Sequence, residues 1–126
     1  MKEELARYRV KDANEKILSS EILLKAKQYK DAASRAYCAM FSAARAVLAT
    51  KGYDSAKHSG VISLFNQHFV KEGILSKNMG RLLAEAKDIR ERGDYGDYII
   101  VSEDEARKHL ERAKNFIKEI ENVLQI

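Results

Sequence analysis

The sequence predicts an all-α fold, an antiparallel bundle of four to five helices with a four-helix up-and-down core. One observation is the absence of proline in a chain rich in alanine, leucine, lysine, glutamate and arginine, which favours long uninterrupted helices. Another is the recurrence of apolar residues every three to four positions, the period of one helix face. A chain of 126 residues can bury a real core, so we expect a single domain over residues 1–126.

Five segments carry this helical period, with breaks between them. They lie near residues 3–27, 31–50, 58–71, 78–92 and 103–125. The second segment has the clearest pattern, because its apolar stripe is flanked by alanines that let neighbouring helices approach on more than one side. We therefore expect it to be the most enclosed helix. Asp31 is its predicted N-cap, and Lys51-Gly52 its predicted end.

The links near the C-terminal half have their own signals. The fourth helix is expected to stop near Arg92, before glycines at 93 and 96. Residues 99–101 are a short β-branched run that can pack across the bundle as an extended segment. Ser102 and Glu105 have the spacing of a capping box at the start of the final helix.

Composition limits the location and the partners of the protein. The single cysteine, Cys38, excludes an internal disulfide and fits a reducing compartment, where we expect it to be an ordinary buried residue. No stretch is long and apolar enough for a signal core or a membrane span, so a cytoplasmic protein without a membrane partner is expected. The formal net charge of +4 permits an acidic partner without requiring one.

Two kinds of site have little support in the sequence. His58, His68 and His109 are scattered without metal-ligand spacing, and His68, on an apolar stripe, is expected to be a core histidine. The six glycines do not form a phosphate-binding loop. We therefore expect no metal and no cofactor.

Residues 90–98, RERGDYGDY, are the strongest candidate for a functional site. They join two predicted helices, and Arg90 follows the apolar stripe closely enough to lie at the edge of the buried face. Arginine can bind phosphate with two nitrogens. Asp94 can orient it or accept a proton, and Tyr95 can donate a hydrogen bond. The alternative is an Arg-Asp pair and a packed tyrosine that only close the helix end.

Three motifs, in order, resemble the HEPN domain, and most closely its small stand-alone prokaryotic group, UPF0332. They are residues 34–46 (SRAYCAMFSAARA), residues 57–60 (KHSG) and the Arg90-x-x-x-Asp94-Tyr95 pattern, within a resemblance spanning roughly residues 32–114. The resemblance implies a helical bundle that commonly dimerises. It also implies a neighbouring minimal nucleotidyltransferase as partner, in a two-gene toxin–antitoxin pair.

Many HEPN proteins are metal-independent endoribonucleases, and the resemblance assigns roles by position. Such enzymes use an arginine, a polar residue directly after it and a histidine four to six residues further on. Arg90 matches the arginine and Glu91 the polar residue, but Tyr95 stands where the histidine would be. An unperturbed tyrosine, with a pKa of about 10, is a poor base.

These considerations give two sets of candidate residues and two rival functions. If the protein cuts RNA, Arg90, Asp94 and Tyr95 are the expected catalytic residues. Nucleotide or RNA phosphate is expected to bind at Arg90, Arg92, Lys57 and His58. The alternative is a non-catalytic helical subunit that serves the nucleotidyltransferase through protein interaction.

Overall fold

The computed structural model describes residues 1–126, apart from the side chain of Tyr95. Its helices are α1 (Lys2–Lys25), α2 (Tyr29–Thr50), α3 (His58–Phe65), α4 (Lys77–Tyr95) and α5 (Glu103–Leu124), and a π-helical turn, η1 (Asn66–Val70), continues α3. The prediction of an all-α bundle is confirmed.

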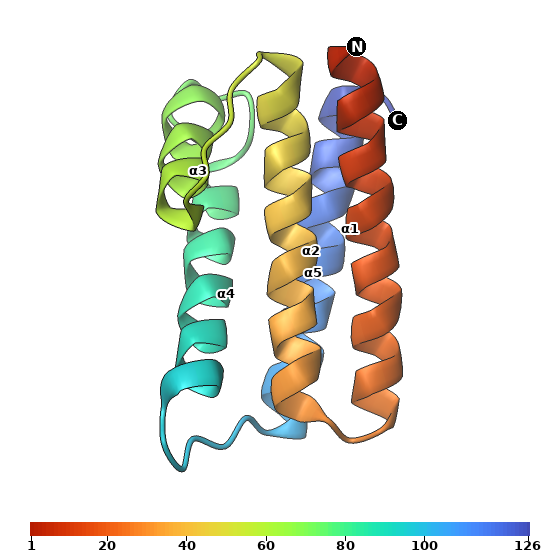
Figure 1. The fold of residues 1–126 in the computed structure, drawn as a ribbon, viewed down its shortest axis with the longest axis vertical. Helices are drawn as coiled ribbons and strands as arrows, with labels where there is room; N and C mark the ends of the chain where they lie inside the picture. Colours follow the sequence, from red (N-terminus) through yellow and green to blue (C-terminus); the bar gives the residue numbers. More distant parts are fainter.

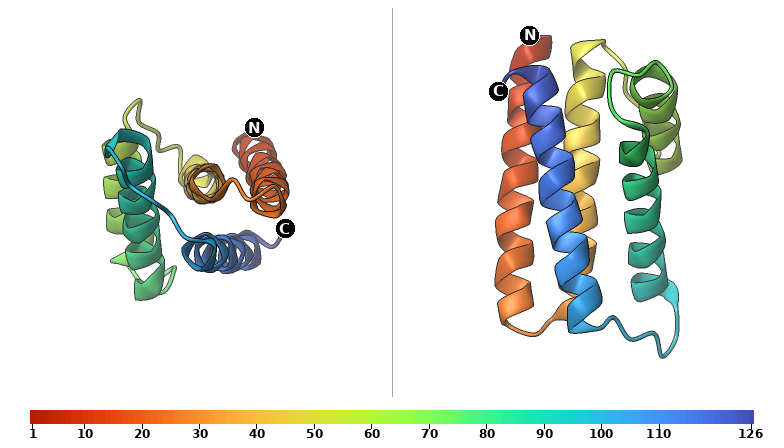
Figure 2. Two further views of the ribbon diagram at one scale, coloured as in Figure 1. Left: turned by 90° about the horizontal axis from the view of Figure 1, so that it is seen from below. Right: turned by 180° about the vertical axis from the view of Figure 1, so that it is seen from behind.

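The four long helices alternate in direction along the chain (Figure 1). Of these, α2 packs against α1, α4 and α5, whereas α1 and α4 do not touch within the described structure. The end-on view in Figure 2 shows why, because α2 and α5 lie between α1 and the layer formed by α3 and α4. The bundle is therefore flattened, with two central helices and two outer ones.

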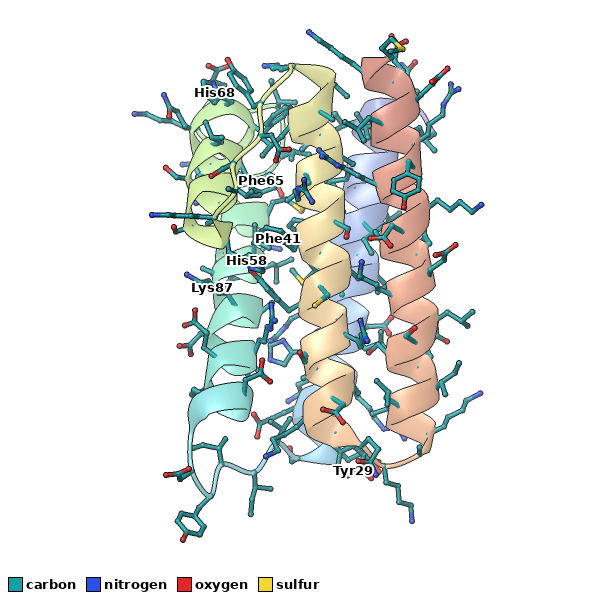
Figure 3. The ribbon with its side chains drawn as sticks, in the orientation of Figure 1. Tyr29, Phe41, His58, Phe65, His68 and Lys87 are labelled. Atoms are coloured by element: carbon teal, nitrogen blue, oxygen red, sulfur yellow. The ribbon has the colours of Figure 1, made fainter. Side chains whose placement is uncertain are left out.

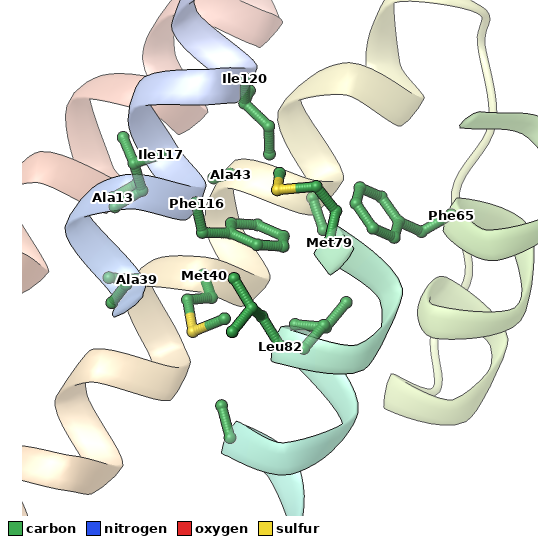
Figure 4. Close-up of a cluster of buried hydrophobic side chains, with 14 of the residues drawn as sticks. Ala13, Ala39, Met40, Ala43, Phe65, Met79, Leu82, Phe116, Ile117 and Ile120 are labelled. Carbon is green, nitrogen blue, oxygen red and sulfur yellow. The ribbon is translucent and has the colours of Figure 1, made fainter. Parts of the chain in front are cut away.

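The enclosure of α2 follows from its small side chains. Ala39, Ala43, Ala44 and Ala46 are each fully buried. An alanine projects little beyond the helix backbone, so neighbouring helices can approach α2 on several sides. Figure 4 shows larger side chains from three other helices filling the space around this alanine surface: Phe65, Met79, Leu82, Phe116 and Ile120. The predicted position of this helix as the most enclosed one is confirmed.

The link between α1 and α2 differs from the prediction. Lys27 adopts a left-handed conformation (φ 63°), and the Gln28 amide donates to the Leu23 carbonyl at 2.9 Å. The chain reverses within this tight turn, so α2 begins at Tyr29 with Gln28 as its N-cap. The prediction of Asp31 as the cap was wrong. Asp31 lies in the first turn of the helix, where its negative charge suits the helix dipole.

The end of α4 also differs from the prediction. The helix does not stop at Arg92 but continues through Gly93 to Tyr95, and Gly96 is its C-cap. Helix periodicity places residues four positions apart on the same face, so Arg90 and Asp94 become neighbours. The segment 90–98 is thus helical in its first part and forms a link only from Gly96 onwards.

The link to α5 confirms the predicted Ser102 cap, but it does not confirm that residues 99–101 pack across the bundle as one segment. Ser102 caps α5, accepting a hydrogen bond from the Glu105 amide at 3.1 Å. In the β-branched run before it, Val101 is buried but Ile100 is almost fully exposed. The run therefore does not pack as a unit. Among the described helices, none is both long enough and apolar enough to cross a lipid bilayer.

Replacing Gly93 with alanine tests the helical continuation. A Cβ at Gly93 would make only an ordinary 3.7 Å contact with Lys30, and the backbone there is helical. We expect Gly93→Ala to raise the free energy of unfolding by up to about 1 kcal/mol. Gly73→Ala is the control, because Gly73 has open space but a left-handed φ of 78°, so alanine there should destabilise. Urea unfolding of both variants measures the difference, and a loss of stability in Gly93→Ala would contradict the helix end at Tyr95.

Candidate functional site

Arg90 is held in place by two side chains. Its guanidinium carbon lies 5.4 Å from the ring centroid of Tyr37, on α2. Its Nε also donates to the Asp94 carboxylate at 3.2 Å. The Arg90 side chain is 30% exposed, so it lies at the edge of the buried face as predicted. Among the described side chains, Asp94 is its one hydrogen-bond partner, which leaves the terminal guanidinium nitrogens available to a ligand.

A hollow of about 230 Å³ opens beside this arginine. Its lining comes from three helices: Tyr37 from α2, His58 from the start of α3, and Lys87, Arg90 and Glu91 from α4. Figure 3 shows His58 and Phe41 together between α2 and α3, with Lys87 on the adjacent part of α4. The hollow therefore combines two cations, a carboxylate, an imidazole and a phenol.

His58 is fixed by two aromatic residues of α2. Its ring stacks on Phe41, with centroids 4.0 Å apart and planes 15° apart. Its Nδ1 lies 3.0 Å from the Tyr37 hydroxyl. Burial lowers the pKa of His58 below its usual value, and the nearby charges of Arg90, Lys87 and Arg45 lower it further. We conclude that His58 is mainly neutral at pH 7.

The cations of the hollow are already paired with carboxylates. Arg90 bonds Asp94, and Lys87 lies 3.6 Å from Glu91. Each pair joins residues four apart on α4, so all four charges lie along one helix. With His58 neutral, the formal charges of these two pairs cancel. The site therefore suits a ligand of low charge better than a highly charged one.

Arg90 also lines a second hollow, of about 390 Å³. The other residues of that hollow come from α1 and the first turns of α2: Leu23, Asp31, Ser34, Arg35 and Cys38. Cys38 is only partly buried, so the expectation of an ordinary buried cysteine was wrong. One arginine thus borders two adjoining hollows, and Ser34 and Arg35 add hydrogen-bond donors beyond the first.

The structure brings together only part of the predicted site. His58 and Arg90 line one hollow, with Asp94 bonded to Arg90. Arg92 lies outside both hollows and pairs with Asp88 at 3.7 Å. Lys57 is the exposed N-cap residue of α3. The predicted role of Tyr95 concerns a side chain outside the described part of the structure.

Sequence reasoning missed Lys87 and Tyr37 as members of the site. Lys87 precedes Arg90 by three residues, a spacing that places both on one helix face, so this signal was present in the sequence. Tyr37 lies on the helix that was predicted to be the most enclosed one, and it is 1% exposed. Nothing in its helical spacing indicated that its hydroxyl would meet His58, since the two residues belong to different helices.

The remaining histidines lie elsewhere. His68 is partly buried and stacks on Tyr53, with centroids 4.1 Å apart, so its prediction as a core histidine was wrong. His109, on α5, is the buried one. Within the part of the chain that the structure describes, no three histidine, cysteine or acidic side chains lie together as a metal-ligand set.

A larger hollow, of about 490 Å³, lies between α1 and α5. Three of its cations are paired with acidic side chains: Arg107 with Glu103, Lys108 with Asp104, and Lys114 with Glu21. These pairs are mostly exposed and contribute little. The hollow contains neither an aromatic ring nor a histidine, so the hollow beside Arg90 is the better candidate site.

Comparison with known proteins identifies the class of this fold. The model of the HEPN domain matches residues 6–123, and the chain belongs to that family. The UPF0332 protein of Thermotoga maritima is 32% identical over 98% of this chain and 94% of its own length. The protein named "Putative toxin MJ0605" of Methanocaldococcus jannaschii is 35% identical over 90% of this chain and 84% of its own length. The resemblance to the HEPN domain and to its UPF0332 group is confirmed.

Proposed function

We propose that this HEPN-domain protein binds phosphate groups of RNA or of a nucleotide at Arg90. The observation that carries the proposal is an arginine that lies over the Tyr37 ring and bonds Asp94 through Nε, so that its terminal nitrogens can bind a ligand. Lys87 and His58 line the same hollow and add further hydrogen-bond donors. A guanidinium beside an ammonium and an imidazole is a common arrangement for phosphate oxygens.

The dimensions and charge of the site favour RNA over a free nucleotide. The hollow of about 230 Å³ is below the usual range for a small-molecule pocket, roughly 300–1,000 Å³. The second hollow beside Arg90 gives room for a chain that continues past the first phosphate. The balanced charges of the two ion pairs suit the single negative charge of a phosphodiester.

The partner in this proposal is a minimal nucleotidyltransferase encoded beside this chain, in a toxin–antitoxin pair. Two relatives support a toxin role through their names alone, "Putative toxin MJ0605" and "Putative toxin MJ0142" of Methanocaldococcus jannaschii. The second is 31% identical over 91% of this chain. The identity of the neighbouring gene tests the pairing, and a genome position without a nucleotidyltransferase gene beside this one would contradict it.

A second candidate function is metal-independent cleavage of RNA, with Arg90, Asp94 and Tyr95 as the catalytic residues. The observation that favours it is the Asp94 carboxylate bonded to Arg90, because the aspartate then lies beside the phosphate-binding group. In this mechanism Arg90 holds the phosphate and Asp94 takes the proton of the ribose 2′-hydroxyl, whose oxygen then attacks the phosphorus. The bond from phosphorus to the 5′-oxygen breaks, and Tyr95, as the donor, gives a proton to that leaving oxygen. The rival function is a non-catalytic subunit in which Arg90 only braces the end of α4.

Homodimerisation, which the resemblance implies, also belongs to the proposal. Tyr8, Leu18 and Ile22 support it, because they are large apolar side chains that are more than half exposed on the outward face of α1. Light scattering at micromolar concentration is expected to give the mass of two chains, and Ile22→Glu to give that of one. Ile100→Glu is the control, an exposed apolar residue in the link before α5. A monomeric parent protein would contradict the dimer.

Removal of the Arg90 guanidinium tests phosphate binding. We expect Arg90→Ala to weaken binding of short single-stranded RNA by about tenfold or more, because the variant cannot make a charge-assisted hydrogen bond to phosphate. The logarithm of affinity should also fall less steeply with the logarithm of salt concentration, by about 0.7 for each phosphate that the variant no longer neutralises. Titration by fluorescence anisotropy at two salt concentrations measures both quantities.

Arg81→Ala is the matched control, since Arg81 is an exposed arginine on the same helix and lies outside both hollows. It should bind RNA as the parent does. Equal affinity of Arg90→Ala and the parent would contradict the proposed function. If Arg90→Ala also melted at a lower temperature, that result would support the rival function, in which Arg90 only braces the helix.

Asp94→Asn separates cleavage from binding. The amide keeps the shape of the side chain but cannot accept a proton, so RNA cleavage in the presence of a chelator should be abolished. Binding of RNA should persist or strengthen, because the carboxylate no longer competes with phosphate for Arg90. Gel analysis of RNA incubated with each protein measures cleavage. Equal cleavage by Asp94→Asn and the parent would exclude Asp94 as the base, and an inactive parent would exclude the ribonuclease.

A further inference from the structure

We propose that Tyr37 fixes His58 as a neutral hydrogen-bond donor, whose Nε2–H binds a phosphate oxygen in the hollow beside Arg90. Tyr37 then acts as a positioning residue, and His58 as a ligand-binding residue that transfers no proton. This inference rests on the proposed phosphate-binding function and deepens it.

The hydrogen atom of the Tyr37 hydroxyl determines which nitrogen of His58 carries the proton. Tyr37 is 1% exposed, and among the described groups its hydroxyl has one hydrogen-bond partner, the Nδ1 of His58 at 3.0 Å. A buried hydroxyl hydrogen needs an acceptor, since leaving it unpaired costs free energy. Nδ1 can accept only when it carries no proton. The proton of the neutral imidazole must then lie on Nε2.

The charge of His58 is controlled by groups on α2 and α4. Burial disfavours the imidazolium, and so do Arg90 and Lys87 on α4 and Arg45 on α2, while Glu91 on α4 acts in the opposite direction. These influences lower the pKa of His58. Burial also raises the pKa of Tyr37 to about 12, so its hydroxyl keeps its hydrogen at neutral pH. The Nε2–H form requires a neutral His58 and a Tyr37 hydroxyl that keeps its hydrogen, and both conditions are met.

Stacking on Phe41 fixes the orientation of the imidazole ring. The two planes lie 15° apart with centroids at 4.0 Å, a stacking contact that favours this orientation of the imidazole. Nδ1 faces Tyr37, and Nε2 is on the opposite side of the ring. His58 lines the hollow that Arg90 and Lys87 also line, and no described group bonds its Nε2. Because His58 is exposed, a phosphate oxygen in the hollow can replace solvent as the acceptor of the Nε2–H.

Tyr37 also contacts the other phosphate-binding group. The Arg90 guanidinium lies over the face of the Tyr37 ring, at 5.4 Å, while the hydroxyl of the same ring bonds His58. One buried side chain thus sets the positions of two phosphate donors on two different helices. A neutral imidazole that donates through Nε2 cannot accept a proton at that nitrogen, as enzymes with neutral histidine donors illustrate. His58 therefore does not replace the missing family histidine as a base.

The form of His58 can be measured without any ligand. Nitrogen-15 NMR of the labelled protein at neutral pH distinguishes Nε2–H from Nδ1–H imidazoles, and His58→Gln identifies the signals of His58. We expect the Nε2–H form in the parent protein. In Tyr37→Phe, which keeps the ring but removes the hydroxyl, we expect a mixture of both forms. An Nδ1–H form in the parent, or an unchanged spectrum in Tyr37→Phe, would overturn the assignment.

Three substitutions of His58 test the donor itself. Glutamine places an N–H near the position of Nε2, asparagine places one near Nδ1, and alanine has neither. We expect His58→Gln to bind short single-stranded RNA nearly as the parent does, and His58→Asn and His58→Ala to bind it about five- to tenfold more weakly, the effect of removing one hydrogen bond. Glutamine as weak as alanine, or asparagine as strong as glutamine, would overturn the proposal. Circular dichroism of each variant checks that all three are folded.

Arg90→Ala in the same titration distinguishes a failure of the His58 donor role from a failure of the phosphate-binding function. If Arg90→Ala weakens RNA binding and His58→Gln binds RNA as weakly as His58→Ala, this inference fails while the proposed function stands. If Arg90→Ala binds as the parent does, the proposed function fails and the donor role fails with it. Parallel titrations with a mononucleotide and with RNA show which of them supplies the phosphate.

Discussion

Close packing around α2 is the constraint on which the rest of this structure depends. Its buried alanines let α1, α4 and α5 approach one helix from different directions. Because such an interface leaves little free volume, a larger side chain at these positions would force the helices apart. The few large residues of α2 then determine which side chains of the neighbouring helices can pack against it. Tyr37 contacts Arg90 of α4, and Phe41 stacks on His58 of α3.

The candidate site is therefore an extension of the core. Tyr37 is buried, yet its ring and hydroxyl contact Arg90 and His58 at the surface. Groups fixed in this way lose little conformational freedom when a ligand binds, which favours affinity. The ion pairs along α4 neutralise the charges of Arg90 and Lys87. A rigid site of low net charge is better suited to recognising one phosphodiester than to attracting polyanions over a distance.

Much of the fold could be predicted because helix periodicity is a local property of the sequence. The five helical segments, the enclosure of α2 and the Ser102 cap all follow from residues close together in the chain. The errors arose where a local signal was weaker than the surrounding structure. Gly93 favours a helix end, but its low helix propensity costs only about 1 kcal/mol, and α4 continues two residues beyond it. Asp31 has the residue type of a cap, but the left-handed turn that sets the start of α2 is at Lys27, where no glycine marks it.

The sequence by itself determined the helical class, the family and the choice of Arg90 as the candidate residue, because each depends on residue types at fixed spacings along the chain. The same spacing rule places Lys87, Arg90 and Asp94 on one side of α4. Only the tertiary structure decided that His58 would meet Tyr37 beside that arginine, since α2, α3 and α4 come together through packing that no local pattern encodes. The physical reason is that periodicity shows which face of a helix is buried but not which helix covers it.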